Sequence, residues 1–206
     1  MEIGVFLSFC LASFLMALSP GPDNIYVLTE SLAKGARNGL WIAFGLNSGV
    51  VVHTLLAATG LSLILKQSEL AFSVVSYLGA AYLLYLAYQA SREDLSFETE
   101  SVKAEKNTSA LKLYRTGVFM NLLNPKVSLF FIAFLPQFLG KGSLPLFWQA
   151  CILGLSFLVI GFATFGSLAL LAHQLRSYFL NPRFVKGMKW MKVIVLLVLA
   201  SFLFVT

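Results

Sequence analysis

The chain has 206 residues, of which 58% are hydrophobic and 12% are charged, and its formal net charge is +6. A soluble core of this size cannot hide so much apolar surface. The composition therefore excludes an ordinary water-soluble domain and predicts an integral membrane protein.

Six segments are long and apolar enough to cross a bilayer. A hydrocarbon core about 30 Å thick requires about 20 apolar residues in a helix. We therefore predict an all-α membrane protein with six transmembrane helices in one domain, residues 1–206. Met1, Glu2 and Ile3 provide no basic leading segment, so the first run is interpreted as a span and not as a secretory signal. The predicted spans are residues 3–33, 40–65, 70–90, 116–140, 144–172 and 188–206.

Lysine and arginine are distributed unevenly among the connections between these spans. Connections two and four carry Lys66 and Lys141, and the other connections carry many more. The basic residues of connections one, three and five are Lys34, Arg37, Arg92, Lys103, Lys106, Lys112, Arg115, Arg176, Arg183, Lys186, Lys189 and Lys192. Because basic residues near span ends stay on the cytoplasmic side, both termini are expected to be periplasmic or extracellular. The positive charge thus follows from topology, and without a reader motif no nucleic-acid partner is expected.

The third connection divides the chain into two halves. Residues 91–113 are polar and mixed in charge, which predicts a cytoplasmic linker between residues 1–90 and residues 114–206. Each half holds three predicted spans. Because three is an odd number, a structural repeat between the halves must be inverted in the membrane.

Proline interrupts the first predicted span of each half. Half one contains Ser19–Pro20 at the start of the segment S-P-G-P-D-N, and half two contains Asn124–Pro125 at the corresponding place. Serine and asparagine are favoured N-cap residues, and proline suits the first position of a helix. We therefore expect spans one and four to be broken at these motifs.

Such breaks leave backbone groups without helical partners. The prolines of the first motif are expected to free carbonyl groups around Met16 and Leu18, and Pro125 is expected to free that of Asn121. Unpaired backbone inside a membrane is tolerated where protein buries it or where it lines a cavity. Unwound segments at corresponding places in two halves are the best sequence indication of a transporter's substrate site.

Two residues of opposite charge accompany the breaks. Asp23 follows the first motif, and Lys126 follows Pro125. Charge at bilayer depth is costly and is by default functional. We interpret Lys126 and the half-helix N-termini as attracting a substrate carboxylate, and Asp23 as meeting a cationic amine or carrying a coupling proton. The alternative is a static Asp23–Lys126 ion pair that locks the halves together.

The second predicted span supplies further candidates. Gly45 and Gly49 give it a small face that another helix can approach closely, which favours a packing role. Asn47 lies between them and is a candidate for the substrate site. His53 is a candidate for a proton path because an imidazole titrates near neutral pH, although a histidine bonded to a neighbouring span is the alternative.

Glu30 is the second candidate for a proton path. It precedes Lys34 by four residues, a spacing that favours a helical ion pair near the cytoplasmic interface. The alternative is a cytoplasmic gate for protons or substrate, because Glu30 follows Asp23 by seven residues and shares its helical face.

Cysteine and histidine chemistry is not indicated. Cys10 and Cys151 lie in different predicted spans and form no C-x-x-C motif, which disfavours a disulfide framework or a redox carrier. His53 and His173 also lie apart, and no cluster with metal-ligand spacing is present. We expect no metal site and no cofactor.

Two motifs resemble the LysE/RhtB translocators, the lysine and homoserine/threonine exporter family. The first is S-P-G-P-D-N-I-Y-V-L-T-E-S-L-A-K-G-A-R-N-G-L with the following G-L-N-S-G, and the second is G-V-F-M-N-L-L-N-P-K-V-S-L-F-F-I-A-F-L-P-Q-F at residues 117–138. The resemblance implies export of amino acids or similar metabolites across the bacterial inner membrane in exchange for protons, and by analogy a homodimer. Carried over by motif, the substrate- or ion-binding positions are Pro20, Gly21, Pro22, Asp23, Asn24, Asn121, Asn124, Pro125 and Lys126.

The sequence thus predicts a proton-coupled exporter of a small zwitterionic solute. Some members of the family carry asparagine directly after the second proline, so the role of Asp23 is less constrained than that of the prolines. The alternatives are a metal-cation exporter and a structural or channel-like membrane subunit. Enzyme signatures such as H-E-x-x-H and G-x-S-x-G are absent, so the chain is not expected to be an enzyme.

Overall fold

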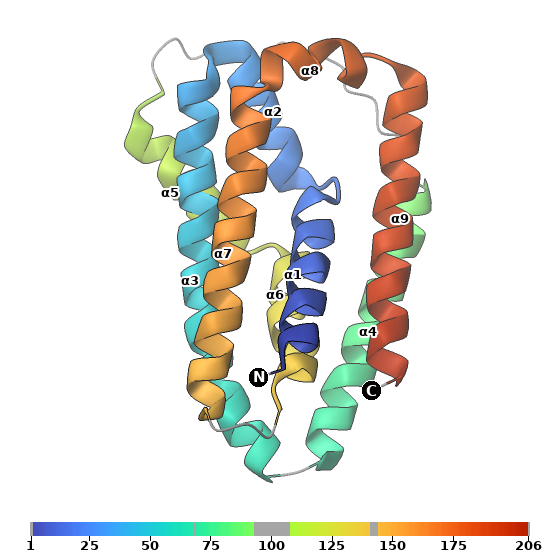
Figure 1. Cartoon of the computed structure of the whole chain (residues 1–206). Coiled ribbons are helices and arrows are strands. Elements are labelled where there is room, and N and C mark those ends of the chain that lie inside the picture. Colours follow the sequence, from blue (N-terminus) through green and yellow to red (C-terminus); the bar gives the residue numbers. More distant parts are fainter. Residues whose placement is uncertain (1, 68, 93–107, 141–143, 206) are drawn as a thin grey trace.

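The described part of the chain is helical throughout. The computed structural model describes residues 2–67, 69–92, 108–140 and 144–205, and no strand occurs among them. Figure 1 shows the helices as a bundle with the short α8 lying across one end. The elements are α1 (Ile3–Leu18), α2 (Pro22–Lys34), α3 (Ala36–Gln67), α4 (Glu69–Arg92), α5 (Ala110–Leu122), α6 (Pro125–Leu129), the π-helix η1 (Phe130–Phe134), the 3₁₀-helix η2 (Leu135–Phe138), α7 (Leu146–Leu170), α8 (Ala172–Phe179) and α9 (Pro182–Val205). The expected all-α class is confirmed.

Several helices are suited to a bilayer by length and composition. Within the described residues, Ala36–Gly60, Leu146–Leu170 and Pro182–Phe204 are long and apolar enough to cross one, and two bent pairs raise the number to five if each is one span. The 24-residue α4 covers the expected third span but is not among these candidates. Large apolar side chains such as Leu78 and Leu155 are exposed, as expected where lipid surrounds the protein.

Both expected interruptions are present. Ile3–Leu18 and Pro22–Lys34 meet at 56°, and Ala110–Leu122 and Pro125–Phe138 meet at 50°. In each case proline occupies the start of the second helix, where its missing N–H leaves no intrahelical bond unmade. Proline is thus present at both bends, as the sequence predicted. The capping pair expected at the first motif was wrong, because Ser19 ends α1 as its C-cap, and Gly21 precedes α2 with Pro22 in the first helical position.

The end of the chain differs from expectation. The last helix begins at Pro182 and not at residue 188, because Asn181 caps it by accepting the N–H of Arg183 at 2.9 Å. Lys186, Lys189 and Lys192 therefore lie on α9. The fifth connection, expected between residues 172 and 188, consists of α8 and the start of α9. The predicted linker at residues 91–113 lies largely outside the described residues, and its last part already begins α5.

The α3 helix packs between α5 and α7, and α4 packs against α9. The contact of α3 with α5 requires glycine on both sides. A Cβ at Gly45 would overlap the carbonyl group of Tyr114, and a Cβ at Gly117 would overlap that of Ile42. The packing role expected for Gly45 is therefore confirmed, and the close approach fixes the helix that carries the second break.

Replacing Gly45 with alanine should separate α3 from α5. We expect the folded protein to lose about 2 kcal/mol, the usual effect of overpacking a tight contact. Thermal unfolding of the detergent-solubilised protein measures this. Gly60→Ala is the matched control on the same helix, because a Cβ there meets nothing within 4 Å. Equal Tm values for the two variants would contradict the packing described here.

Candidate functional site

The first break exposes carbonyl groups that side chains then satisfy. The α1 helix ends at Leu18, and Gly21 precedes α2 in an extended conformation without a side-chain cap. Lys126 donates from Nζ to the carbonyl oxygens of Met16 at 3.1 Å and Ser19 at 3.0 Å. Asn24 donates from Nδ2 to the carbonyl oxygen of Ala17 at 2.9 Å. The carbonyl groups of break one are thus capped partly by a lysine from the other half of the chain.

The second break is built in a similar way. Asn124 is the N-cap of α6, and its Oδ1 accepts the N–H of Lys126 at 3.0 Å. The carbonyl oxygen of Asn121, which Pro125 deprives of its helical partner, lies 3.3 Å from Nε2 of His53. Because a carbonyl oxygen only accepts, Nε2 carries the hydrogen in this contact. His53 therefore joins α3 to break two. This is the alternative considered for it above, a histidine bonded to a neighbouring span.

Asn124 also connects the two breaks directly. Its Nδ2 donates to Oδ2 of Asp23 at 2.8 Å, and Asp23 is only 3% exposed. Among the described residues, no ion pair within 4.0 Å joins Asp23 to Lys126. The alternative of a static pair is therefore not what the structure contains. Instead, Asp23 of the first motif accepts from Asn124 of the second, and Lys126 of the second motif donates to carbonyl groups of the first. Each charged group thus joins the two motifs through a different partner.

Several buried oxygen atoms around the breaks are left without a hydrogen-bond partner in the described part of the chain. They are Oγ of Ser19, Oδ1 of Asp23, Oδ1 of Asn24 and Oδ1 of Asn121. Buried polar atoms are nearly always satisfied, by protein, water or ligand. Since each of these atoms can accept, the site as built has unused capacity for hydrogen-bond donors such as an ammonium group.

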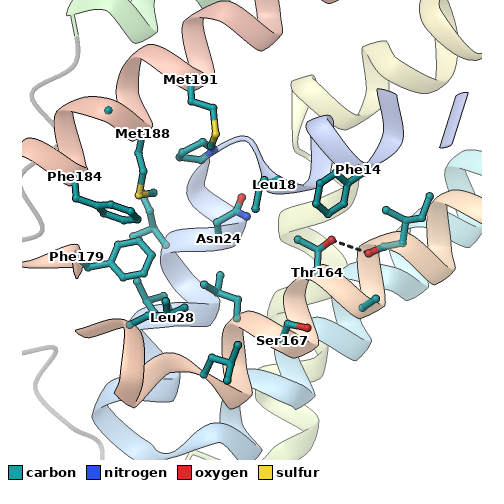
Figure 2. A pocket seen from close by; sticks show the side chains of 18 of the residues that line it. Phe14, Leu18, Asn24, Leu28, Thr164, Ser167, Phe179, Phe184, Met188 and Met191 are labelled. Atoms are coloured by element: carbon teal, nitrogen blue, oxygen red, sulfur yellow. Dashed lines mark hydrogen bonds between the residues drawn. The ribbon is translucent and has the colours of Figure 1, made fainter. Parts of the chain in front are cut away.

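A cavity of about 860 Å³ adjoins break one. Pro20 and Asn24 line it at the break, and α7, α8 and α9 supply much of its wall. Figure 2 shows Asn24 among the apolar side chains of the wall, with Thr164 and Ser167 on α7. Sequence reasoning did not identify these two residues. The sequence of α7 gives no signal that singles them out, because Gln149 and Ser156 are also polar residues of this helix.

The other sequence candidates lie around the breaks with different partners. Asn47 donates to the carbonyl oxygen of Ala43 at 2.8 Å and faces Gly161 of α7, so its described contacts are with α3 and α7. Glu30 pairs with Lys34 at 3.1 Å, as the helical spacing predicts. Lys34 in turn donates to Oγ1 of Thr108 at 3.2 Å, which ties the end of α2 to the start of α5. Pro22 and Pro125 are exposed, whereas Pro20 and Gly21 are buried.

The structure offers no obvious metal centre in the residues it describes. No group of three or more histidine, cysteine, aspartate or glutamate side chains could hold an ion there. Cys10 and Cys151 are free thiols. The polar groups at the breaks are amide, carboxylate, ammonium and backbone carbonyl groups, a set suited to a solute with its own donors and acceptors.

A family model described as LysE type translocator matches residues 14–206. The chain belongs to this family. The resemblance inferred from the two proline motifs is thereby confirmed. LysE type translocators are transporters, so the protein is a membrane translocator and not an enzyme.

Relatives of this LysE type translocator include proteins of named and unnamed activity. An uncharacterized membrane protein of Vibrio cholerae is 30% identical over 190 residues, which cover 91% of this chain and 90% of that protein. The homoserine/homoserine lactone efflux protein of Salmonella typhimurium is 30% identical over 181 residues, covering 88% and 86%. The uncharacterized membrane protein YrhP of Bacillus subtilis is 31% identical over 141 residues, covering 65% and 67%. No solved structure matches the chain.

Asn124 of this translocator has two separable roles, which substitution can distinguish. Asn124→Ala removes both the N-cap of α6 and the bond to Asp23, and should cost about 1 kcal/mol of stability from the cap alone. Asn124→Ser keeps a capping oxygen but has no amide to donate to Asp23. We therefore expect the serine variant to unfold at a higher Tm than the alanine variant, because it keeps the cap, yet to transport more slowly than the wild type. Equal transport by the serine variant and the wild type would show that the Asn124–Asp23 bond is dispensable.

Proposed function

We propose that this translocator exports amino acids or similar small zwitterionic metabolites across the bacterial inner membrane in exchange for protons. The observation that carries the proposal is the joining of two broken helices through Asn124 and Lys126, with unpartnered oxygen atoms of Asp23 and Asn24 beside the junction. Family membership and the homoserine/homoserine lactone efflux relative support the same conclusion.

The proposed architecture has six spans in two inverted halves. Helix pairing supports it: α3 and α7 hold corresponding places in the halves and pack together, and so do α4 and α9. The packing of α1 on α7 then corresponds to that of α5 on α3. At about 1.5 Å per residue, the 24-residue α4 is long enough for a core about 30 Å thick.

The proposed orientation places α8 and the α2–α3 connection in the cytoplasm and both termini outside. These two basic segments lie at the same end of the bundle, and the labelled termini lie toward the other end (Figure 1). The positive-inside rule assigns such an end to the cytoplasm. The membrane that borders the bacterial cytoplasm is the inner membrane, which is therefore the proposed location.

In the proposed mechanism Asp23 is the exchange point for the proton and the substrate amine. Its Oδ2 is held by Asn124, and its Oδ1 is free for either of them. Lys126 attracts the substrate carboxylate, since its ammonium group has one N–H beyond the two that cap carbonyl groups. A proton path through Glu30 and His53, substrate contact by Asn47, and a homodimer remain predictions.

Everted inner-membrane vesicles containing the protein test this function. Respiration acidifies their lumen, so an exporter that exchanges protons accumulates labelled solute inside. The panel of solutes should contain homoserine, other amino acids and divalent cations. The amino acids can be selected by a growth screen in which the overexpressed protein relieves their toxicity. We expect respiration-dependent accumulation of at least one amino acid, which a protonophore abolishes. Flux that continues after the gradient collapses would indicate a channel instead.

A further inference from the structure

We infer that the cavity beside break one receives the side chain of the substrate, so that the protein favours amino acids with aliphatic or aromatic side chains. This inference rests on the proposed function and specifies its substrate class. It starts from the cavity of about 860 Å³, which has the size and the predominantly apolar lining of a small-molecule site, about 300 to 1,000 Å³.

The cavity is apolar on nearly every side. Leu18 and Leu28 belong to its wall near break one, and the sulfur-containing side chains of Met188 and Met191 lie on α9. Phe179, at the end of α8, also contributes to the wall. An aliphatic or aromatic side chain would leave water for this space, whereas a lysine or glutamate side chain would have to bury its charge there.

Asn24 sets the orientation of the occupant. Asn24 is only 8% exposed. Its Nδ2 donates to the carbonyl oxygen of Ala17, whereas its Oδ1 has no hydrogen-bond partner among the described residues. Thr164 already donates to the carbonyl oxygen of Ile160. Among the buried side-chain atoms of the described lining residues, the unpartnered acceptor is therefore Oδ1 of Asn24, at break one and next in sequence to Asp23. A substrate amine placed there leaves its side chain pointing into the apolar space.

The position of the cavity distinguishes it from an ordinary lipid groove. A second hollow of about 550 Å³ lies between α1 and α9, with Phe134 and Phe138 in its wall, and is also apolar. None of the residues at the two breaks, 19–24 and 124–126, lines it. The larger cavity, in contrast, includes Pro20 and Asn24 in its wall and has Arg183 at the start of α9. The guanidinium group provides a positive charge near the expected cytoplasmic end, where a substrate carboxylate would arrive first.

A homologous series of solutes tests the inference on the wild-type protein. Alanine, 2-aminobutyrate, norvaline and norleucine are used as competitors of labelled solute uptake into everted vesicles. We expect the inhibition constant to fall about fourfold for each added methylene group, the gain from burying one. An inhibition constant that does not fall along the series would overturn the inference. In that case the cavity holds only a lipid chain or no ligand at all.

A variant that fills the cavity provides the second measurement. Ser167→Trp places an indole in the space, and Leu155→Trp is the control on the same helix, exposed and outside the lining. We expect Ser167→Trp to reduce leucine export relative to homoserine export by about tenfold, in line with steric discrimination in apolar pockets. An equal effect on both solutes would contradict the inference. If the wild type accumulates no amino acid, the proposed function itself fails, which is a distinguishable result.

Discussion

Asp23→Asn is expected to abolish proton-driven export while the protein still folds. The amide has the same shape as the carboxylate. Its oxygen can accept from Nδ2 of Asn124, which donates to Oδ2 of Asp23 at 2.8 Å in the structure. It can neither bind a proton near neutral pH nor attract an ammonium group as a charge. We expect accumulation in everted vesicles to fall at least about 100-fold, the usual effect of removing a proton-transferring group.

Exchange without a gradient separates the two roles proposed for Asp23. If Asp23 carries only the proton, the asparagine variant should still exchange labelled for unlabelled solute across the membrane. If it binds the substrate amine, exchange should be lost as well. Glu2→Gln is the matched control, because Glu2 is an exposed carboxylate whose side chain makes no capping bond to α1. Gradient-driven accumulation at the wild-type rate in Asp23→Asn would remove Asp23 from the mechanism.

The breaks could be predicted from the sequence because proline acts locally. The loss of a backbone donor at Pro20 or Pro125 and the capping preference of Asn124 depend on neighbours within one helical turn. The structure accordingly begins α2 at Pro22 and α6 at Pro125. The pair Asn181–Pro182 has the same form and begins α9, so the early start of that helix was also present in the local sequence.

The partners of the freed carbonyl groups could not be predicted in this way. Lys126 caps Met16 and Ser19 across more than 100 positions of sequence, and only the packing of the two halves determines that contact. The large cavity is also a property of packing. Its wall combines residues of α1 and α2 with residues of α7, α8 and α9, and no single segment shows a polar pattern that marks it.

These contacts predict that both the fold and transport depend on Lys126. In the described arrangement it holds break one to break two, and opening of the interface requires its bonds to Met16 and Ser19 to be exchanged for other partners. In the proposed mechanism a substrate carboxylate is such a partner. This mechanism couples substrate binding to release of the two halves through one ammonium group, because a ligand shifts a conformational equilibrium by its differential affinity for the two states.

Lys126→Met is therefore expected to destabilise the protein and to stop export. Methionine fills similar space without donors, so the carbonyl groups of Met16 and Ser19 lose two charge-assisted bonds, at a cost of about 3 kcal/mol in total. Thermal unfolding measures this cost, with Lys186→Met as the control for an exposed lysine on α9. Lys126→Arg keeps a cation and should recover much of the stability. Export is then compared per folded molecule: loss in the stable arginine variant assigns Lys126 to the transport step, whereas wild-type export in both variants would limit it to holding the halves together.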